Sequence, residues 1–118
     1  MGILSEIKKV LDTLHIPCET GRMSSPVPDG YCVLVPLGED SLWGDDTIDT
    51  DVEECIVSVF TKGNYIKMKN TLIRALLLNG FTVTGRAYIG YEEDTGYFHY
   101  EITAAHEYPF SEEIESEE

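Results

Sequence analysis

The feature that most constrains the fold is one helix with well-marked ends that directly follows a strand. The stretch "VEECIVSVFTKG" is dominated by β-branched and aromatic residues and closes at Gly63, which is typical of a strand. The next residues predict a helix from about Tyr65 to Asn79, with Asn64 as its N-cap and Gly80 as a left-handed residue past its end. This order predicts a sheet that the helix covers.

The predicted helix has one apolar and one basic side. Its apolar face is formed by Met68, Leu72 and Leu76 together with Ile66, Ile73 and Leu77. Its polar face is formed by Lys67, Asn70, Thr71 and Arg74. Half of the eight basic residues lie at this junction and helix: Lys62, Lys67, Lys69 and Arg74. A solvated helix face is the simpler interpretation, and contact of Lys62, Lys67 and Arg74 with an acidic neighbour is the alternative.

The other segments predict a second helix and a set of strands. Apolar residues recur at helical spacing from Ile3 to Leu14, and Pro17 prevents continuation. A short strand is predicted at Cys18 to Arg22. The run "YCVLVPL" indicates a strand covered on both faces that ends at Pro36. The stretches "FTVTGRAYIGY" and "YFHYEITAAHEY" flank "EEDTG" and predict a β-hairpin.

Alternation along this hairpin predicts which side chains share a face. In the first strand, one face is predicted to hold Phe81, Val83, Ala87, Ile89 and Tyr91, and the other Thr82, Thr84, Arg86 and Tyr88. In the second strand, one face is predicted to hold Phe98, Tyr100, Ile102 and Ala104.

Together these elements predict an α+β fold. The sheet is expected to be mainly antiparallel, with an N-terminal helix and one central helix packed on one face, plus a long acidic loop. A chain of 118 residues is typical of a single domain, predicted here at residues 1–110. Residues 111–118, within "SEEIESEE", are predicted to be a disordered acidic tail, with a dedicated interaction tail as the alternative.

The acidic segment 38–50, "GEDSLWGDDTIDT", is predicted to be a long loop or a projecting hairpin. An exposed tryptophan is costly unless it folds back onto the core or enters a partner. On the second interpretation Leu42, Trp43, Asp45 and Asp46 form a docking arm. Eight acids between Glu39 and Glu54 make this the only candidate metal site, but the ligand spacing and mid-loop glycine of a calcium loop are missing, so we expect no metal.

Composition and motifs argue against several classes of function. The net charge of −14 repels phosphate backbones, which excludes an ordinary groove-reading DNA-binding protein. Three cysteines without a Cys-x-x-Cys pair argue against a disulfide framework or zinc site. No segment resembles a secretion signal or a membrane span, so we expect a protein made in a reducing cytoplasm.

No arrangement of residues predicts catalysis. "FTKGNY" lacks the ending of a phosphate-binding loop and the spaced glycines of a dinucleotide turn, so it is interpreted as a corner of the fold. His99 and His106 are seven residues apart, which places them on opposite faces of a regular strand. No serine or cysteine lies in a nucleophile motif. We therefore expect neither an enzyme nor a cofactor.

The ordering of elements resembles a family. An opening helix ending "LHIP", a Pro-rich turn before "YCVLVPL", an acidic insertion, "CIVSVFTKGNY" leading into "LIRALLLNGF" and a last hairpin around "EEDTGYFHYEI" are similar to the small tail-completion, or tail-terminator, proteins of long-tailed bacteriophages and prophages. The resemblance spans roughly residues 3–108.

This resemblance implies a structural virion protein. Such proteins form a ring, commonly a hexamer, that caps the tail tube protein and joins it to the head connector proteins while DNA passes nearby without specific binding. The implied location is the virion, after assembly in the host cytoplasm. The main alternative is an acidic DNA mimic that inhibits a nuclease or another DNA-binding protein. A small enzyme is the third possibility.

Overall fold

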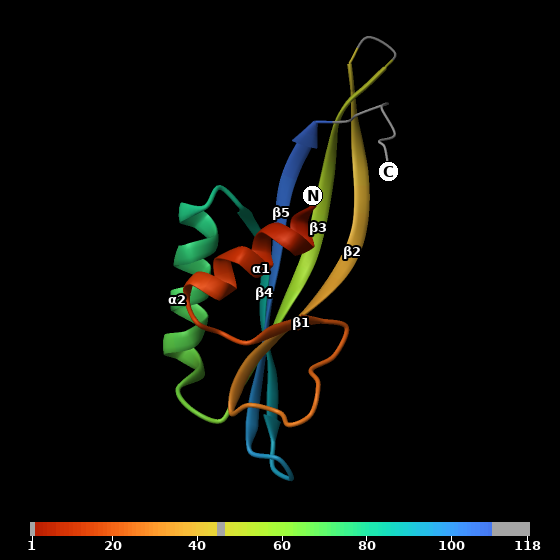
Figure 1. The fold of residues 1–118 in the computed structure, drawn as a ribbon. Coiled ribbons are helices and arrows are strands. Elements are labelled where there is room, and N and C mark those ends of the chain that lie inside the picture. The colour runs from red at the N-terminus through yellow and green to blue at the C-terminus, as the bar shows by residue number, and fades with distance from the viewer. Residues whose placement is uncertain (1, 45–46, 110–118) are drawn as a thin grey trace.

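The part of the chain that the structure describes folds into one five-stranded sheet with two helices. The computed structural model describes residues 2–44 and 47–109, with the backbone alone for residues 39–44, 47–50 and 109. In chain order the elements are α1 (Ile3–Thr13), β1 (Cys18–Thr20), β2 (Gly30–Gly44), β3 (Thr47–Thr61), α2 (Tyr65–Leu78), β4 (Thr82–Glu92) and β5 (Tyr97–Pro109). The sheet order is β1-β2-β3-β5-β4, and only the β1–β2 pair is parallel. The predicted α+β architecture is confirmed (Figure 1).

Both helices bury their apolar residues against the same face of the sheet. The helices contribute Ile3, Ile7, Val10, Leu11, Leu72 and Leu76. The sheet contributes Cys32, Leu34, Cys55, Val57, Val59, Tyr100, Ile102 and Ala104. The apolar face of α2 is narrower than predicted, because Ile66 and Leu77 are 50% and 55% exposed. We call the covered side the helix face and the other side the open face.

The acidic segment 38–50 is a pair of strands where the backbone is described, so the expectation of a long loop is wrong and the projecting hairpin is the better description. β2 and β3 stay paired from Gly38↔Glu54 to Gly44↔Thr47, with a register shift between Leu42 and Trp43. Figure 1 shows this ribbon extending beyond the helices. Tryptophan, isoleucine and threonine in this segment favour extended backbone, which offsets the poor strand propensity of its acids.

The prediction that Pro36 ends its strand is also wrong. β1 reaches only Cys18–Thr20 and pairs with Cys32–Leu34, so in the described residues one side of β2 has no partner strand beyond Leu34. The missing N–H of a proline is tolerated at such an edge. β1 is shorter than predicted because Gly21, with φ of +87°, turns the chain away.

The prediction that β2 is covered on both faces holds only in part. Cys32 on the helix face is 0% exposed, whereas on the open face Val33 is 7% exposed and Val35 is 38% exposed. The open face is partly closed by its own aromatic side chains, because the ring of Tyr31 stacks on Phe60 at 5.0 Å. A continuous apolar run therefore reflects cross-strand packing here and not a second layer of helices.

Two bulges in β4 change the face assignment that simple alternation predicts. The register shifts lie between Val83 and Gly85 and between Tyr88 and Gly90. After the first bulge, Arg86 is opposite Ile102 and Tyr88 is opposite Tyr100, so both lie on the helix face. The predicted grouping of Ala87 with Val83 is therefore wrong, because the first bulge adds one residue to the strand and Ala87 is opposite Glu101.

Candidate functional site

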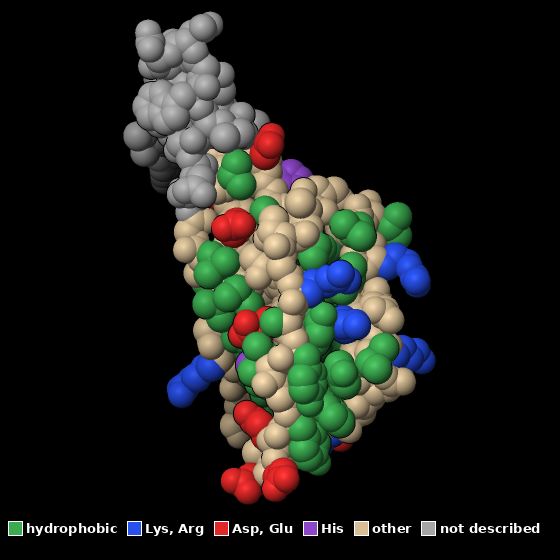
Figure 2. Space-filling model, turned by 180° about the vertical axis from the view of Figure 1, so that it is seen from behind, with side chains coloured by type: hydrophobic (Ala, Val, Ile, Leu, Met, Phe, Trp, Pro, Cys, Tyr) green, Lys and Arg blue, Asp and Glu red, His purple; other side chains and the backbone are tan. Residues whose placement is uncertain are grey.

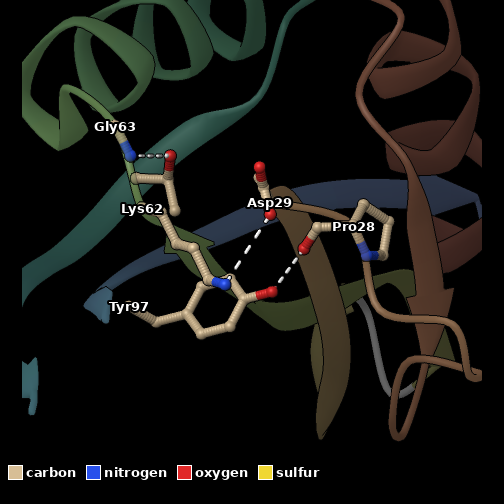
Figure 3. A network of polar contacts seen from close by, with 6 residues as sticks. Pro28, Asp29, Lys62, Gly63 and Tyr97 are labelled. Carbon is tan, nitrogen blue, oxygen red and sulfur yellow. Dashed lines mark hydrogen bonds and ion pairs between the residues drawn. The ribbon is translucent and has the colours of Figure 1, made fainter. Parts of the chain in front are cut away.

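The corner between β3 and α2 holds the fold together. The Lys62 backbone N–H donates to the carbonyl of Asp29 at 2.9 Å, and Lys62 Nζ lies 3.8 Å from Asp29 Oδ1. The same Nζ lies 5.1 Å from the centre of the Tyr97 ring. The hydroxyl of Tyr97 donates to the Pro28 carbonyl, and the Gly63 N–H donates to Thr61 Oγ1 (Figure 3). Lys62 thus ties the corner to the loop before β2, which agrees with the predicted structural role of this junction.

The N-terminus of α2 is closed by the predicted cap. The Asn64 side chain accepts a hydrogen bond from the backbone N–H of Lys67 at 3.0 Å. Gly80 follows the helix with φ of +89°, which agrees with the predicted left-handed residue. The backbone N–H groups of Lys62, Gly63 and Lys67 therefore all donate to acceptors within the chain. The candidate residue Lys62 contributes an intramolecular contact.

The other two candidate bases lie at exposed positions of α2. Lys67 and Arg74 are exposed, whereas Lys69 lies over the ring of Tyr100 at 5.3 Å. Arg74 lines a hollow of about 420 Å³ together with Arg86 from β4. Sequence reasoning missed Arg86, because alternation placed it away from the apolar positions of β4.

A signal that could have found Arg86 is the distribution of charge along the chain. Residues 56–91 contain no Asp or Glu and five bases, which gives this stretch +5. All 22 acids and the other three bases lie outside it, which gives the remainder −19. Figure 2 shows most of the visible Lys and Arg side chains on one side of the molecule, with hydrophobic side chains between them, and one on the opposite side.

The candidate hairpin residues lie apart from this basic side. In the backbone register Leu42 is opposite Thr50 and Trp43 is opposite Ile48, so both belong to the far part of the β2–β3 ribbon. Asp45 and Asp46 lie outside the described residues. The structure therefore divides the predicted interaction residues into an acidic ribbon and a basic helix side.

The two strand histidines lie on opposite faces, as predicted. The His99 ring stacks on Phe60 at 4.2 Å on the open face. On the helix face, the His106 ring lies 5.2 Å from Phe81 and 4.8 Å from Tyr108. Within residues 2–44 and 47–109, no group of three or more His, Cys, Asp or Glu side chains is placed to hold a metal ion.

The cysteines are small core residues. All three are buried and free: Cys18, Cys32 and Cys55. Burial raises the pKa of Cys18 to about 11 and that of Cys55 to about 12, and it also raises the pKa of Cys32. These thiols are therefore protonated at neutral pH and poor nucleophiles.

Two acids at the base of the ribbon join α1 to the sheet. Glu53 Oε1 accepts from the N–H of Ile3 at 3.0 Å, and Glu6 Oε1 accepts from the hydroxyl of Tyr108 at 3.0 Å. Burial, the hydrogen bond to Glu6 and the charges of Glu6 and Glu53 raise the pKa of Tyr108. These carboxylates support the fold at the point where the ribbon leaves it.

Comparison with known proteins returns no family model that matches the chain and no curated protein with significant similarity. The resemblance to tail-completion proteins thus rests on the order of elements alone and stays a prediction. In the described part of the chain, no helix is long and apolar enough to cross a membrane.

Proposed function

We propose that this protein is a structural component that assembles with copies of itself into a ring and completes a bacteriophage tail, joining the tail tube to the head connector. The observation that carries the proposal is a sheet with uncovered edges and a long projecting ribbon. Such a shape leaves hydrogen-bonding and apolar groups that neighbouring subunits can satisfy.

The sheet edges support assembly. Among the described residues, β4 pairs only with β5, and β2 beyond Leu34 pairs only with β3. An edge strand presents unpaired backbone N–H and C=O groups, which can pair with another chain. The two bulges of β4 interrupt this edge, so side-chain contacts beside it have to supply part of any interface.

The ribbon supports assembly for a second reason. β2 and β3 are each 15 residues long, and their paired far parts extend beyond the helices (Figure 1). β5 pairs with β3 as far as Thr50↔Pro109, so among the described residues only the tip, residues 43–44 with 47–49, is two-stranded. A two-stranded ribbon alone in water is marginally stable. A ribbon that packs on a neighbouring subunit gains the cover that its own chain does not provide in the described structure.

The charge of the chain suits a channel through which DNA passes. With a net charge of −14, the surface repels a phosphate backbone and does not retain it. The same charge is compatible with the alternative, an acidic DNA mimic. The two functions differ in their partners, because a mimic binds a basic protein in competition with DNA.

The proposal is tested by measuring the mass of the purified protein by light scattering after size exclusion, and by imaging labelled protein on isolated phage tails. We expect a ring-sized oligomer and label at one end of each tail. A protein that is monomeric at every concentration and does not bind tails would overturn the proposal. Binding to a basic DNA-binding protein that DNA competes away would favour the mimic.

A further inference from the structure

We infer that the groove between α2 and the edge strand β4 receives the acidic β2–β3 ribbon of a second copy of this chain. The inference rests on the proposed self-assembly and identifies the two surfaces that would meet. They are different surfaces of one chain, so the contact is head-to-tail.

Apolar side chains make up half of the lining of the groove. It is a hollow of about 420 Å³ lined by Asn70, Ile73, Arg74, Leu77, Leu78 and Arg86. Leu77 and Leu78 are 55% and 80% exposed. Two further half-exposed apolar residues, Ile66 and Tyr88, lie on the same two elements. Single exposed apolar side chains are ordinary, but several on adjoining elements mark an interaction surface.

The groove also has a basic lining. Arg74 from α2 and Arg86 from β4 both line it, and neither arginine forms an ion pair with a carboxylate among the described residues. No acid is present anywhere in residues 56–91, which include all of α2 and most of β4. The partner that fits this surface is therefore an acidic segment with an apolar anchor.

The ribbon of a second copy has this chemistry. Its segment 39–54 contains no base and eight acids: Glu39, Asp40, Asp45, Asp46, Asp49, Asp51, Glu53 and Glu54. Leu42 and Trp43 lie in the same segment, and tryptophan and arginine are the residue types that most often dominate binding energy at interfaces. In Figure 1 the ribbon extends away from α2 of its own chain, so the groove it would enter belongs to a neighbour.

A nucleic acid is the less suitable occupant of this groove. Five bases in residues 56–91 are set against a remainder of −19, so a polyanion approaching the molecule meets net repulsion. A ribbon from a second copy is guided to the groove by its local charge and held by apolar contact. A head-to-tail contact of this kind closes into a ring when the rotation between neighbours allows it.

The test is a charge exchange between the two surfaces. The groove variant carries Arg74→Glu and Arg86→Glu, and the ribbon variant carries Asp40→Lys and Asp49→Lys. A third protein carries all four changes. The control, Lys9→Glu with Arg22→Glu, changes the net charge as much as the groove variant does, but on α1 and on the loop after β1. Self-association is measured by sedimentation equilibrium at low salt, and folding by circular dichroism.

Wild type and control are expected to self-associate. The groove variant and the ribbon variant are expected to associate at least about 100-fold more weakly than wild type. The protein with all four changes, the fourfold variant, is expected to recover part of the lost association, because the two introduced lysines can pair with the two introduced glutamates while six acids remain in the ribbon segment. An oligomeric wild type with an unaffected groove variant would overturn this inference and leave the proposed ring in place. A monomeric wild type, or a fourfold variant that stays dissociated while folded, would also overturn it. Labelling of tail ends decides the proposed function separately.

Discussion

Replacing Leu76 by alanine tests whether α2 is held on the sheet by its buried leucines. Leu76 is 0% exposed and belongs to the core cluster that also contains Leu72 and Ile102. Leu78 is only two residues further along the same helix and is 80% exposed. Leu78→Ala is therefore a matched control with the same chemical change and the same effect on helix propensity.

The expected cost follows from the burial of Leu76. The change removes three buried carbons, and their transfer to water costs about 2.4 kcal/mol at about 0.8 kcal/mol per methylene. A residual hole of about 50 Å³ adds about 1.2 kcal/mol. We therefore expect Leu76→Ala to lower the free energy of unfolding by about 3 to 4 kcal/mol, and Leu78→Ala to change it by less than about 0.5 kcal/mol.

The assay is urea unfolding followed by far-UV circular dichroism, at protein concentrations below any self-association. Equal slopes of free energy against urea show that the two variants expose similar surface on unfolding, so their midpoints can be compared directly. In thermal unfolding, the loss at Leu76 corresponds to a melting temperature lower by about 10 to 20 °C.

Two results would refute this reasoning. A Leu76→Ala protein with the stability of wild type would show that α2 is not a packed cover of the sheet. An equal loss in Leu76→Ala and Leu78→Ala would show that the cost arises from the helix itself and not from burial. If the groove inference is right, Leu78→Ala also weakens self-association, which Leu76→Ala does not do directly.

Three further predictions address single features. Trp43→Ala is expected to abolish assembly in light scattering with little change in melting temperature; a large loss of stability would place Trp43 in the core. Asn64→Ala should cost about 1 kcal/mol in urea unfolding, because the N–H of Lys67 loses its acceptor, whereas Asn64→Gly should cost only a few tenths. Cys18 has its pKa raised from 9.0 to about 11 by burial, so its thiol ionises more readily in the unfolded chain. Stability should be unaffected by this thiol below pH 9 and should fall as pH rises toward 11, and Cys18→Ala should lessen that fall; an identical alkaline slope in both proteins would contradict it.

Elements with local signals were predicted closely. The N-cap Asn64 and the left-handed Gly80 bound α2 in the structure as the sequence indicates, because both effects depend on a few neighbouring residues. The alternation of β5 also predicted its buried residues Tyr100, Ile102 and Ala104, since no bulge interrupts the pairing of that strand with β3.

Features that depend on distant partners were not predicted. The sequence predicts a strand end at Pro36, but whether a proline is tolerated within β2 depends on how far β1 extends along it. The first bulge in β4, between Val83 and Gly85, moves Arg86 to the helix face. The alternation of residues within β4 does not reveal such a bulge, because the bulge is defined by the pairing of β4 with β5. Of the candidate site, Lys67 and Arg74 were found by counting charges on one helix, and Arg86 required the tertiary structure.

The placement of β3 beside β5 has a consequence for how the chain folds. The β2–β3 and β4–β5 pairs are hairpins of neighbouring strands, but the central pairs join residues separated by 37 positions, from Thr61 to Phe98, up to 59, from Thr50 to Pro109. Closing loops of this length is slower than forming either hairpin, so we expect the two hairpins to form first and the central seam to close last. Until it closes, β3 and β5 can pair with the same strands of another chain, so crowded refolding should yield dimers that exchange the β4–β5 hairpin.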